Sequence, residues 1–444
     1  MLAGEQPVSG LLDMAVACYA RGEMASAGRL FSAVLQSEPA NAIANHQLGL
    51  LAFSTGNAAL AEQFLRQAVE SNPGDCEYHN NLGVVRHARG DHTGARLSFE
   101  NAIAQDARSA QAFNNLGAAL TALNDDEGAI RAYRRALEID PGYVEARDNL
   151  DLACVRVAPA WHFPMMADAA RNEAYDAALR RAAPGRRVLD IGAGSGLLAM
   201  MAARAGAASV TTCEMTPAIA AAAQDIIRIN GFADRIDLHA KRSDQLQVGR
   251  DLAERADVLV TETFSSGLLT ESILPTIEHA REHLLTPDAV VIPRRASARG
   301  FLVGGSTLEA QAYVTQASGF DLSRFNLFGS TKFGLHLDRI EHEALSDDFE
   351  IFGFDLMQPS FPPERRPLTV TANRSGRCVG LAQWLRLDLD RETTYENRPN
   401  AGAGANGWMH IVYRFPEPLE LRAGDEVRLL ASHSRKDMMV TLVS

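Results

Sequence analysis

Apolar and small residues recur with a fixed period of 34 positions in the first third of the chain. A Leu-Gly pair ends at Gly49, Gly83 and Gly117, and alanines follow 12 and 19 positions after each glycine. Between those alanines stands one large apolar residue per unit: Leu65, Phe99 and Tyr133. Such self-similarity indicates stacked helix pairs, in which small residues let two helices approach and a large residue fills the space between them. We therefore predict an all-α array of about four units over residues 8–143, within a domain of residues 1–150.

After residue 159 the pattern changes to apolar runs that alternate with helical periodicity. Residues 161–182 predict a helix, and residues 188–191 predict a buried strand that leads into a glycine-rich turn. Further strands are expected at residues 209–213, 236–239 and 258–260, and a helix end, turn and strand within 284–293. Continuous apolar strands separated by helices are typical of a parallel sheet with both faces covered. We predict a Rossmann-like α/β domain over residues 151–294.

The last third consists of short strand patterns separated by proline and glycine. The expected strands are residues 298–303, 349–354, 369–371, 380–388, 409–415 and 426–431. Many short strands of this kind predict an antiparallel β-barrel domain, here over residues 295–444. Residues 318–339 interrupt the pattern with phenylalanine and leucine that no strand would bury.

Composition narrows the classes of partner and compartment. The formal net charge is -12, which argues against non-specific nucleic-acid binding and suits a cationic substrate or partner. Residues 1–150 hold 11 Arg, no Lys and 18 Asp and Glu, so the array favours a basic ligand segment. The five cysteines form no CxxC pair, which predicts neither a metal site nor a disulfide framework. With no signal-peptide pattern and no membrane-length apolar run, we expect a reduced, cytoplasmic setting and no membrane partner.

The glycine turn indicates a nucleotide-like cofactor, and an acid beside it indicates which kind. A GxGxxG turn after a strand also occurs in nicotinamide-binding domains, so by itself it is a weak signal. Here Asp190 precedes Gly192, Gly194 and Gly196, and a carboxylate at that point would repel a pyrophosphate. It suits S-adenosylmethionine, which carries an α-amino group and a sulfonium but no phosphate. Glu214, at the end of the next predicted strand, is placed to bind the ribose hydroxyls.

Two glutamates flank a turn after the fourth predicted strand. Glu262 and Glu271 stand on either side of the Ser265-Ser266-Gly267 turn, which lets the chain double back. Two carboxylates that converge in this way can hold a planar guanidinium from two sides. Taken alone, the same residues are also compatible with two ordinary surface glutamates.

From residue 161 to the end, the chain resembles the protein arginine N-methyltransferase family, and most of all its divergent branch. The resemblance rests on VLDIGAGSG (188–196), TCEM (212–215), VTETFSSGLLTE (260–271), LLTPDAVVIP (284–293) and HFPMMADAARNEAY (162–175). The 34-residue units resemble the tetratricopeptide repeat. The resemblance implies a homodimer, because residues 318–339 fall where the family inserts a dimerisation arm. A locally packed helical insertion is the alternative for this segment.

The resemblance also implies roles for individual residues. Glu262 and Glu271 match the family's catalytic two-glutamate loop. The implied cofactor contacts are Met165 near the sulfonium, Arg171 at the carboxylate, Asp190 with Gly192, Gly194 and Gly196 as the floor, Glu214 at the ribose and Asp244 beside the adenine.

One loop departs from the family pattern. The family's threonine-histidine-tryptophan loop is matched by Asn406-Gly407-Trp408, so the histidine is missing. In the family this histidine pairs with the acid that Asp168 matches. We therefore expect Asp168 and Trp408 in the substrate pocket.

Three functions remain open at this point. The chain is expected to methylate arginine in proteins, with the repeats docking the substrate, or to methylate free arginine or a small guanidine, with the repeats serving dimer assembly. A catalytically silent scaffold is the third, since repeat arrays also occur purely as binding surfaces. The sequence does not determine which nitrogen is methylated or how many methyl groups are added.

Overall fold

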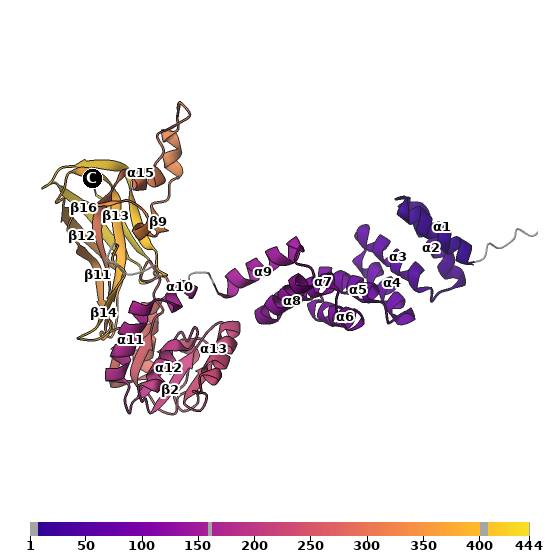
Figure 1. Ribbon diagram of the computed structural model, residues 1–444, viewed down its shortest axis with the longest axis horizontal. Helices are drawn as coiled ribbons and strands as arrows, with labels where there is room; N and C mark the ends of the chain where they lie inside the picture. Colours follow the sequence, from indigo (N-terminus) through magenta and orange to yellow (C-terminus); the bar gives the residue numbers. More distant parts are fainter. Residues whose placement is uncertain (1–7, 159–161, 400–406, 444) are drawn as a thin grey trace, which may run out of the picture. The chain divides into compact units, whose positions relative to one another are not determined.

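The computed structural model describes residues 8–158, 162–399 and 407–443. The chain divides into two compact units, Met1–Pro159 and Ala160–Ser444, and each is described by itself (Figure 1). None of the described helices is long and apolar enough to cross a membrane.

The first unit is a helical array, as the period of 34 residues predicts. Four antiparallel helix pairs are followed by a ninth helix, which continues past residue 150. The helices are α1 (Val8–Ala20), α2 (Met24–Ser37), α3 (Ala42–Ser54), α4 (Ala58–Ser71), α5 (Cys76–Ala88), α6 (His92–Gln105), α7 (Ala110–Ala122), α8 (Asp126–Ile139) and α9 (Val144–Val157).

The repeated glycines set the distance between the two helices of a pair. A Cβ on Gly83 would lie 2.5 Å from a ring carbon of Phe99, and one on Gly117 would lie 2.4 Å from a ring carbon of Tyr133. Both distances are shorter than any real contact, so the large residue of the second helix packs on bare backbone. The small and large positions of the repeat are therefore partners, which the sequence analysis expected.

The second unit begins with a five-stranded parallel sheet, and its helices are drawn in Figure 1. Its strands are β1 (Arg187–Ile191), β2 (Ser209–Cys213), β3 (Ile236–His239), β4 (Ala256–Thr261) and β5 (Leu285–Ile292), and its helices are α10 (His162–Met166), α11 (Ala169–Ala182), α12 (Leu197–Arg204), α13 (Pro217–Ile229) and α14 (Ile273–His283). The single helix predicted for residues 161–182 is wrong, because Asp168 starts a new helix by accepting a hydrogen bond from Arg171 N at 3.0 Å. Trp161 lies outside the described residues.

The order of the parallel strands explains where a site can form. The order is β3-β2-β1-β4-β5. From β1 the chain adds β2 and β3 on one side, and it then returns to add β4 and β5 on the other side, so the order of strands switches between β1 and β4. Ile191 of β1 is in register with Thr261 of β4, and Thr261 Oγ1 donates to Ile191 O at 2.8 Å. The loops that begin at Gly192 and Glu262 therefore leave the sheet side by side, at the position where such sheets bind ligands.

The antiparallel part forms two sheets. The seven-stranded sheet holds β6 (Arg295–Gly304), β9 (Lys332–Leu335), β10 (Glu343–Ala344), β11 (Phe349–Asp355), β13 (Gly376–Asp388), β14 (Thr394–Glu396) and β15 (His410–Leu421). The three-stranded sheet holds β12 (Glu364–Thr371), β16 (Glu426–His433) and β17 (Met438–Leu442). The predicted antiparallel domain is confirmed, but its barrel is not closed, because no ladder joins the two sheets among the strands that the structure describes.

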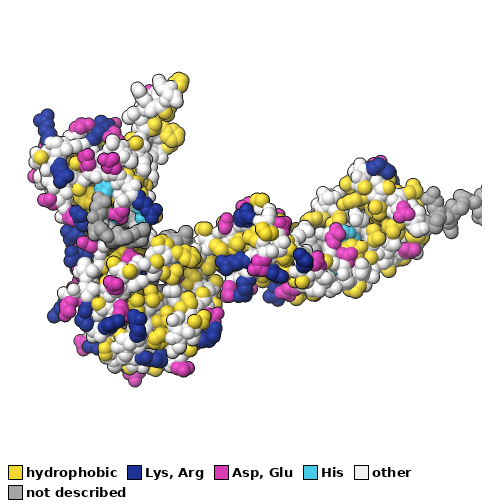
Figure 2. Space-filling model, viewed as in Figure 1, with side chains coloured by type: hydrophobic (Ala, Val, Ile, Leu, Met, Phe, Trp, Pro, Cys, Tyr) yellow, Lys and Arg dark blue, Asp and Glu magenta, His cyan; other side chains and the backbone are white. Residues whose placement is uncertain are grey.

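The segment predicted to interrupt the strands projects from the seven-stranded sheet. It contains β8 (Phe320–Asp321), the short helix η2 (Ser323–Phe328) and the short helix η3 (Leu337–Arg339), and it is preceded by α15 (Ser306–Ala312) and β7 (Gln316–Ala317). Apolar side chains lie on this projection in Figure 2, and Phe325, Leu327 and Phe328 are 69%, 74% and 76% exposed. Residues 332–335 of the predicted arm are instead strand β9, which pairs with β15.

Candidate active site

The glycine turn after β1 has a backbone that only glycine adopts with ease. Gly192, Gly194 and Gly196 have φ values of +87°, +51° and +78°. A Cβ on Gly192 would lie 2.6 Å from Thr263 Cγ2, so this residue is also held close to the loop after β4. No heavy atom lies within 4 Å of where a Cβ on Gly194 would be. The turn thus leaves open space directly above the sheet edge.

Asp190 is a buried carboxyl group at the end of β1, and only one of its two oxygens has a described hydrogen-bond partner. Its Oδ2 accepts from Thr212 Oγ1 at 2.8 Å, whereas Oδ1 has no hydrogen-bond partner among the described residues. Burial raises the pKa of Asp190 to about 7, and the negative charge of Glu214 adds to the effect. The Thr212 hydrogen bond and the positive charge of Arg171 oppose it. A buried acid with an unsatisfied oxygen is a ready partner for a cationic ligand.

Glu214 follows β2 and is held by two backbone donors. Its Oε2 accepts from Gly194 N at 3.2 Å, and its Oε1 accepts from Thr216 N at 2.9 Å. The carboxylate is therefore fixed beside the glycine turn while each oxygen keeps a lone pair. This is the position that the sequence analysis expected for a ribose-binding acid.

Arg171 of α11 and Glu262 form a two-point ion pair. Nε and Nη2 of Arg171 contact the two carboxylate oxygens of Glu262, and both side chains are 5% exposed. Nη1 donates to Asn172 Oδ1 at 2.6 Å, and burial lowers the pKa of Arg171. The first carboxylate of the predicted clamp is thus not a surface residue, and it already binds a guanidinium.

The loop around Glu271 contains two non-glycine residues with positive φ values, one before Glu271 and one after it. Leu268 and Ser272 have φ values of +69° and +61°, and strain of this kind at non-glycine residues clusters at functional loops. The Glu271 side chain keeps contact with solvent. The protein atoms crowded around it nevertheless raise its pKa, and the negative charge of Glu214 adds to this.

The antiparallel domain holds the turn between the two glutamates. Gln383 Nε2 of β13 donates to Ser266 O at 3.3 Å, and Met409 N donates to Ser266 Oγ at 3.1 Å. Tyr413 Oη in turn donates to Gln383 Oε1 at 2.7 Å, within a buried environment. Sequence reasoning missed Gln383, although a single polar residue within the apolar run 378–385 was a usable signal.

A tyrosine that the sequence analysis did not single out, Tyr395, contacts Asp168 and Trp408, the two residues expected in the substrate pocket. We call these three residues the far wall of the site. Tyr395 Oη of β14 donates to Asp168 Oδ2 at 2.5 Å, so Asp168 has a partner despite the missing histidine. The Tyr395 ring meets Trp408 edge to face at 5.6 Å. A Cβ on Gly407 would lie 2.7 Å from Met165 N, which brings this loop against α10. Asn406, the remaining residue of this loop, lies outside the described residues.

Asp244 makes no described hydrogen bond to another predicted cofactor residue. It lies in the short helix η1 (Ser243–Gln245) and pairs with Arg242 at 2.9 Å. This pairing lowers the pKa of Asp244. Its predicted role beside the adenine stays a prediction.

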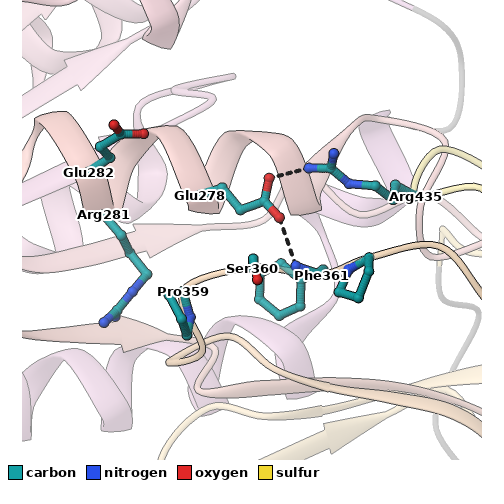
Figure 3. Close-up of a pocket in the computed structure, with 8 residues that line it drawn as sticks. Glu278, Arg281, Glu282, Pro359, Ser360, Phe361 and Arg435 are labelled. Carbon is teal, nitrogen blue, oxygen red and sulfur yellow. Dashed lines mark hydrogen bonds and ion pairs between the residues drawn. The ribbon is translucent and has the colours of Figure 1, made fainter.

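A separate hollow of about 640 Å³ lies beside α14, and its residues are drawn in Figure 3. Glu278 crosses it, pairing with Arg435 and accepting from Phe361 N at 2.7 Å. The acid is therefore already satisfied, and the hollow contains none of the predicted site residues. Its lining is Glu278, Arg281, Glu282, Pro359, Ser360, Phe361, Pro362 and Arg435. Within the described part of the chain, no group of three or more His, Cys, Asp and Glu side chains is arranged to hold a metal.

Family models match both units. Residues 173–292 match the ribosomal protein L11 methyltransferase model, and residues 19–82 and 110–143 match tetratricopeptide repeat models. Among solved structures, a Trypanosoma brucei PRMT1 enzyme-prozyme complex with AdoHcy superposes with a TM-score of 0.54 over 61% of this chain and 87% of that one. At 23% identity, this likeness shows the fold alone.

Curated relatives are more similar in sequence. An arginine N(omega)-methyltransferase of Streptomyces achromogenes subsp. streptozoticus is 40% identical over 65% of this chain and 80% of its own length. Protein arginine N-methyltransferase 7 of Drosophila willistoni is 33% identical over 62% of this chain, which spans 47% of that relative. The rice protein of the same name, from Oryza sativa subsp. indica, is 34% identical, and the chain spans 36% of it. The chain therefore belongs to the arginine N-methyltransferase family of S-adenosylmethionine-dependent enzymes, as a divergent member with N-terminal tetratricopeptide repeats.

Proposed function

We propose that this protein transfers a methyl group to a nitrogen of an arginine guanidinium that is held between Glu262 and Glu271. The observation that carries the proposal is the two-point contact between Glu262 and the guanidinium of Arg171. This contact supports the proposal, because a carboxylate that accepts from one guanidinium has an orientation that suits such a partner. Glu271 leaves the same loop with a solvent-accessible carboxylate that a second guanidinium can reach.

The residues present fit S-adenosyl-L-methionine. The unsatisfied, buried Oδ1 of Asp190 suits its α-amino group, and the open space at Gly194 leaves room for it. Arg171 would hold its carboxylate, and Glu214 would hold its ribose. When bound, the cofactor supplies an electrophilic methyl group on a sulfonium.

The task of the two glutamates is orientation. A guanidinium has a pKa above about 12, so it does not become nucleophilic by simple deprotonation. Carboxylates on two of its nitrogens draw positive charge toward them and point the third nitrogen at the methyl group. Such positioning can contribute roughly 7–11 kcal/mol of the barrier. The negative charges of the two carboxylates also stabilise the cationic product.

Proton release is assigned to Glu271. As the carbon–nitrogen bond forms and the carbon–sulfur bond breaks, the attacking nitrogen must lose one proton. Burial and the charge of Glu214 raise the pKa of Glu271, which makes it a better proton acceptor than an ordinary glutamate. Glu262 is less suited to this role because Arg171 neutralises it.

Arg171 can serve the cofactor and Glu262 together. A guanidinium has five N–H donors in one plane. Arg171 uses Nε and Nη2 for Glu262 and one bond from Nη1 for Asn172, which leaves donors for a further carboxylate. We infer that Arg171 orients the first glutamate before the substrate arrives.

The substrate has two candidate forms. Protein arginine is favoured by the helical array, because repeats of this kind can dock a polypeptide substrate. Free arginine is favoured by the 40% identity to a relative named for arginine rather than protein arginine. We place protein arginine first. Only about a fifth of that relative lies outside the match, which is too short for an array like that of residues 8–157. The array therefore distinguishes this chain from the relative named for arginine.

Labelled S-adenosylmethionine separates these forms. The protein is incubated with free arginine and, separately, with an arginine-rich peptide, and the hydrolysed products are analysed for methylarginine. Label in the peptide supports protein arginine, and label in free arginine alone supports the second form. Absence of label in both would contradict the proposed function and leave the silent scaffold.

We also propose that the protein is a cytoplasmic homodimer. The exposed apolar tip of the projection, Phe325, Leu327 and Phe328, supports self-association. The five cysteines are free thiols, which supports a reducing compartment.

A further inference from the structure

Ser266, in the turn between the two glutamates, receives two hydrogen bonds from the antiparallel domain. Gln383 Nε2 of β13 donates to Ser266 O at 3.3 Å, and Met409 N donates to Ser266 Oγ at 3.1 Å. One bond ends on the main chain of the serine and the other on its side chain. We call residues 262–271 the glutamate loop, and Ser266 is a point at which the antiparallel domain fixes it.

The position of Ser266 within the glutamate loop lets it influence both carboxylates. It stands four residues after Glu262 and five before Glu271. The loop folds back on itself beside it, because Ser265 Oγ accepts from Thr270 N at 3.3 Å. A shift of Ser266 relative to the antiparallel domain would therefore move the turn that carries both glutamates.

The same serine connects the glutamate loop to the far wall. Met409 directly follows Trp408, whose ring meets Tyr395 edge to face at 5.6 Å. Tyr395 Oη in turn donates to Asp168 Oδ2 at 2.5 Å. The hydrogen bond from Met409 N to Ser266 Oγ thus joins the two sides of the expected substrate pocket. It limits how far the glutamates can move from the far wall.

A buried pair of side chains fixes the other bond to Ser266. Gln383 is 0% exposed, and its strand β13 lies between β6 and β15 in the middle of the sheet. Ser266 O can only accept, so the amide nitrogen of Gln383 must face it and the amide oxygen must face Tyr413. Tyr413 Oη donates to that oxygen at 2.7 Å. Burial raises the pKa of Tyr413, so its hydroxyl keeps its proton and stays a donor.

The stability of the sheet does not require an amide at this place. The residues around Gln383 in β13, Leu381, Ala382, Trp384 and Leu385, are apolar and buried. A buried amide in such surroundings is unfavourable unless its hydrogen bonds are made, and an apolar side chain of similar length needs no partner. The network of Gln383 and Tyr413 directs one donor at the glutamate loop, which indicates a role in its position.

We propose that Ser266 is a positioning residue for methyl transfer, which sets the distance between the glutamate loop and the far wall, and that Gln383 and Tyr413 hold it in place. The inference rests on the proposed function, because Glu262 and Glu271 are the groups that are positioned. An arginine guanidinium then meets two carboxylates whose distance from the opposite wall is fixed before it binds.

Steady-state kinetics with free arginine and with an arginine-rich peptide test this role. Gln383→Met keeps the length of the side chain and removes its donor and acceptor, and Tyr413→Phe removes only the hydroxyl. In both variants we expect KM for the acceptor to rise at least about threefold and kcat/KM to fall about tenfold. A fraction of unfolded enzyme would lower kcat and leave KM unchanged, so a raised KM reports position rather than stability.

Matched variants control for the loss of a hydroxyl. Tyr313→Phe removes a hydroxyl that donates to Phe415 O of the same sheet at 2.7 Å, and it should keep the wild-type KM. At the serine itself, Ser266→Ala should raise KM about threefold, whereas Ser266→Thr retains a hydroxyl and should restore the wild-type value. Since both bonds end on one residue, the effects of Ser266→Ala and Gln383→Met should not be additive in the double variant.

Hydrogen exchange followed by mass spectrometry reports the glutamate loop without any substrate. We expect the amides of residues 262–271 to exchange about tenfold faster in Gln383→Met than in the wild type, while those of β2 keep their rates. The affinity for S-adenosylmethionine, measured by calorimetry, should stay within about threefold of wild type, because Asp190 and Glu214 lie on other loops. Unchanged affinity also shows that the variant is folded.

The outcomes separate this inference from the proposed function. A raised KM with faster loop exchange in Gln383→Met and Tyr413→Phe, absent from Tyr313→Phe, supports both. If the wild type methylates an acceptor and KM is unchanged in Gln383→Met and Tyr413→Phe, the inference is overturned and the proposed function stands. If the wild type methylates neither acceptor, the proposed function fails and the positioning role fails with it.

Discussion

At the residue scale, the site is a set of carboxylates whose partners differ in kind. Glu262 is neutralised by Arg171, Glu214 is held by two backbone N–H groups, and Asp190 keeps an unsatisfied oxygen. Glu271 alone among the two loop glutamates is open to solvent. The four acids can therefore do different work in one site, and two of them give testable consequences here.

Cofactor affinity should depend on the ionisation of Asp190. Its pKa in the free protein is raised to about 7 by burial. A cationic group bound beside it favours the ionised form, so binding lowers this pKa and the affinity is full only above pH 7. Between about pH 7 and about pH 6 the dissociation constant for S-adenosylmethionine should rise up to tenfold, as titration calorimetry would show.

Two asparagine substitutions provide the comparison. Asp190→Asn should weaken binding and remove most of the pH dependence. Asp244→Asn should leave the pH dependence intact, because pairing with Arg242 keeps the pKa of Asp244 low. A wild-type affinity that does not change between these pH values would contradict the role given to Asp190.

Tyr395→Phe tests the far wall. The substitution keeps the ring against Trp408 but removes the hydrogen bond to Asp168, whose other oxygen caps α11. Asp168 is partly buried, and an acceptor left unpaired there costs up to about 1–3 kcal/mol, so we expect kcat/KM to fall roughly tenfold. Tyr133→Phe in the array removes a hydroxyl far from any predicted site residue in sequence and should keep the wild-type rate. Equal kcat/KM for Tyr395→Phe would show that Asp168 needs no partner.

Individual site residues were predictable to the extent that their neighbours are local in sequence. Asp190 and its glycines belong to one strand and turn, so their arrangement follows from the chain itself. Tyr395 meets Asp168 across 227 residues, and no local pattern indicates such a pair. The Arg171–Glu262 ion pair, across 91 residues, was missed for the same reason.

At the element scale, the repeat glycines are the clearest case in which the packing of two helices requires one particular residue type. Gly117→Ala would place a methyl group 2.4 Å from the Tyr133 ring, and we expect a loss of about 1–3 kcal/mol in the free energy of unfolding. Gly28→Ala in α2 meets only Leu51 at 3.6 Å, so helix propensity should make it neutral or stabilising by up to about 1 kcal/mol. Denaturant unfolding followed by circular dichroism compares the two. Equal stability of both variants would refute the packing role.

Secondary structure was predicted well where one face of an element determines its pattern. The central strands β1 and β4 are buried along almost their whole length and contain apolar runs, whereas β3 (Ile236–His239) is only partly buried and was predicted from a shorter pattern. The break before α11 was missed because the sequence pattern does not distinguish Asp168 from other residues of a helix. The new helix starts there because the Asp168 side chain caps it. The split of the antiparallel domain into two sheets depends on pairing between distant strands, which a strand pattern does not specify.

At the scale of the whole molecule, the projecting segment should determine the oligomeric state. Leu327 and Phe328 are both at least 74% exposed, and an apolar tip of this kind favours burial against a second copy. The double substitution Leu327→Glu and Phe328→Glu should convert a dimer into a monomer, as light scattering coupled to size exclusion would report. Leu97→Glu, a 49% exposed leucine in α6, is the control and should not change the mass. A wild-type monomer would contradict the predicted homodimer.

The most direct test of the account concerns Glu271. Glu271→Gln keeps the shape of the side chain and removes both its charge and its capacity to accept a proton, whereas Glu282→Gln removes the charge of an exposed glutamate on α14. Both variants are assayed for methyl transfer to arginine and, by calorimetry, for S-adenosylmethionine binding. We predict that Glu271→Gln lowers kcat by at least about a hundredfold with its cofactor affinity within about threefold of wild type, while Glu282→Gln behaves as wild type. Methyl transfer at the wild-type rate by Glu271→Gln would contradict the two-carboxylate mechanism.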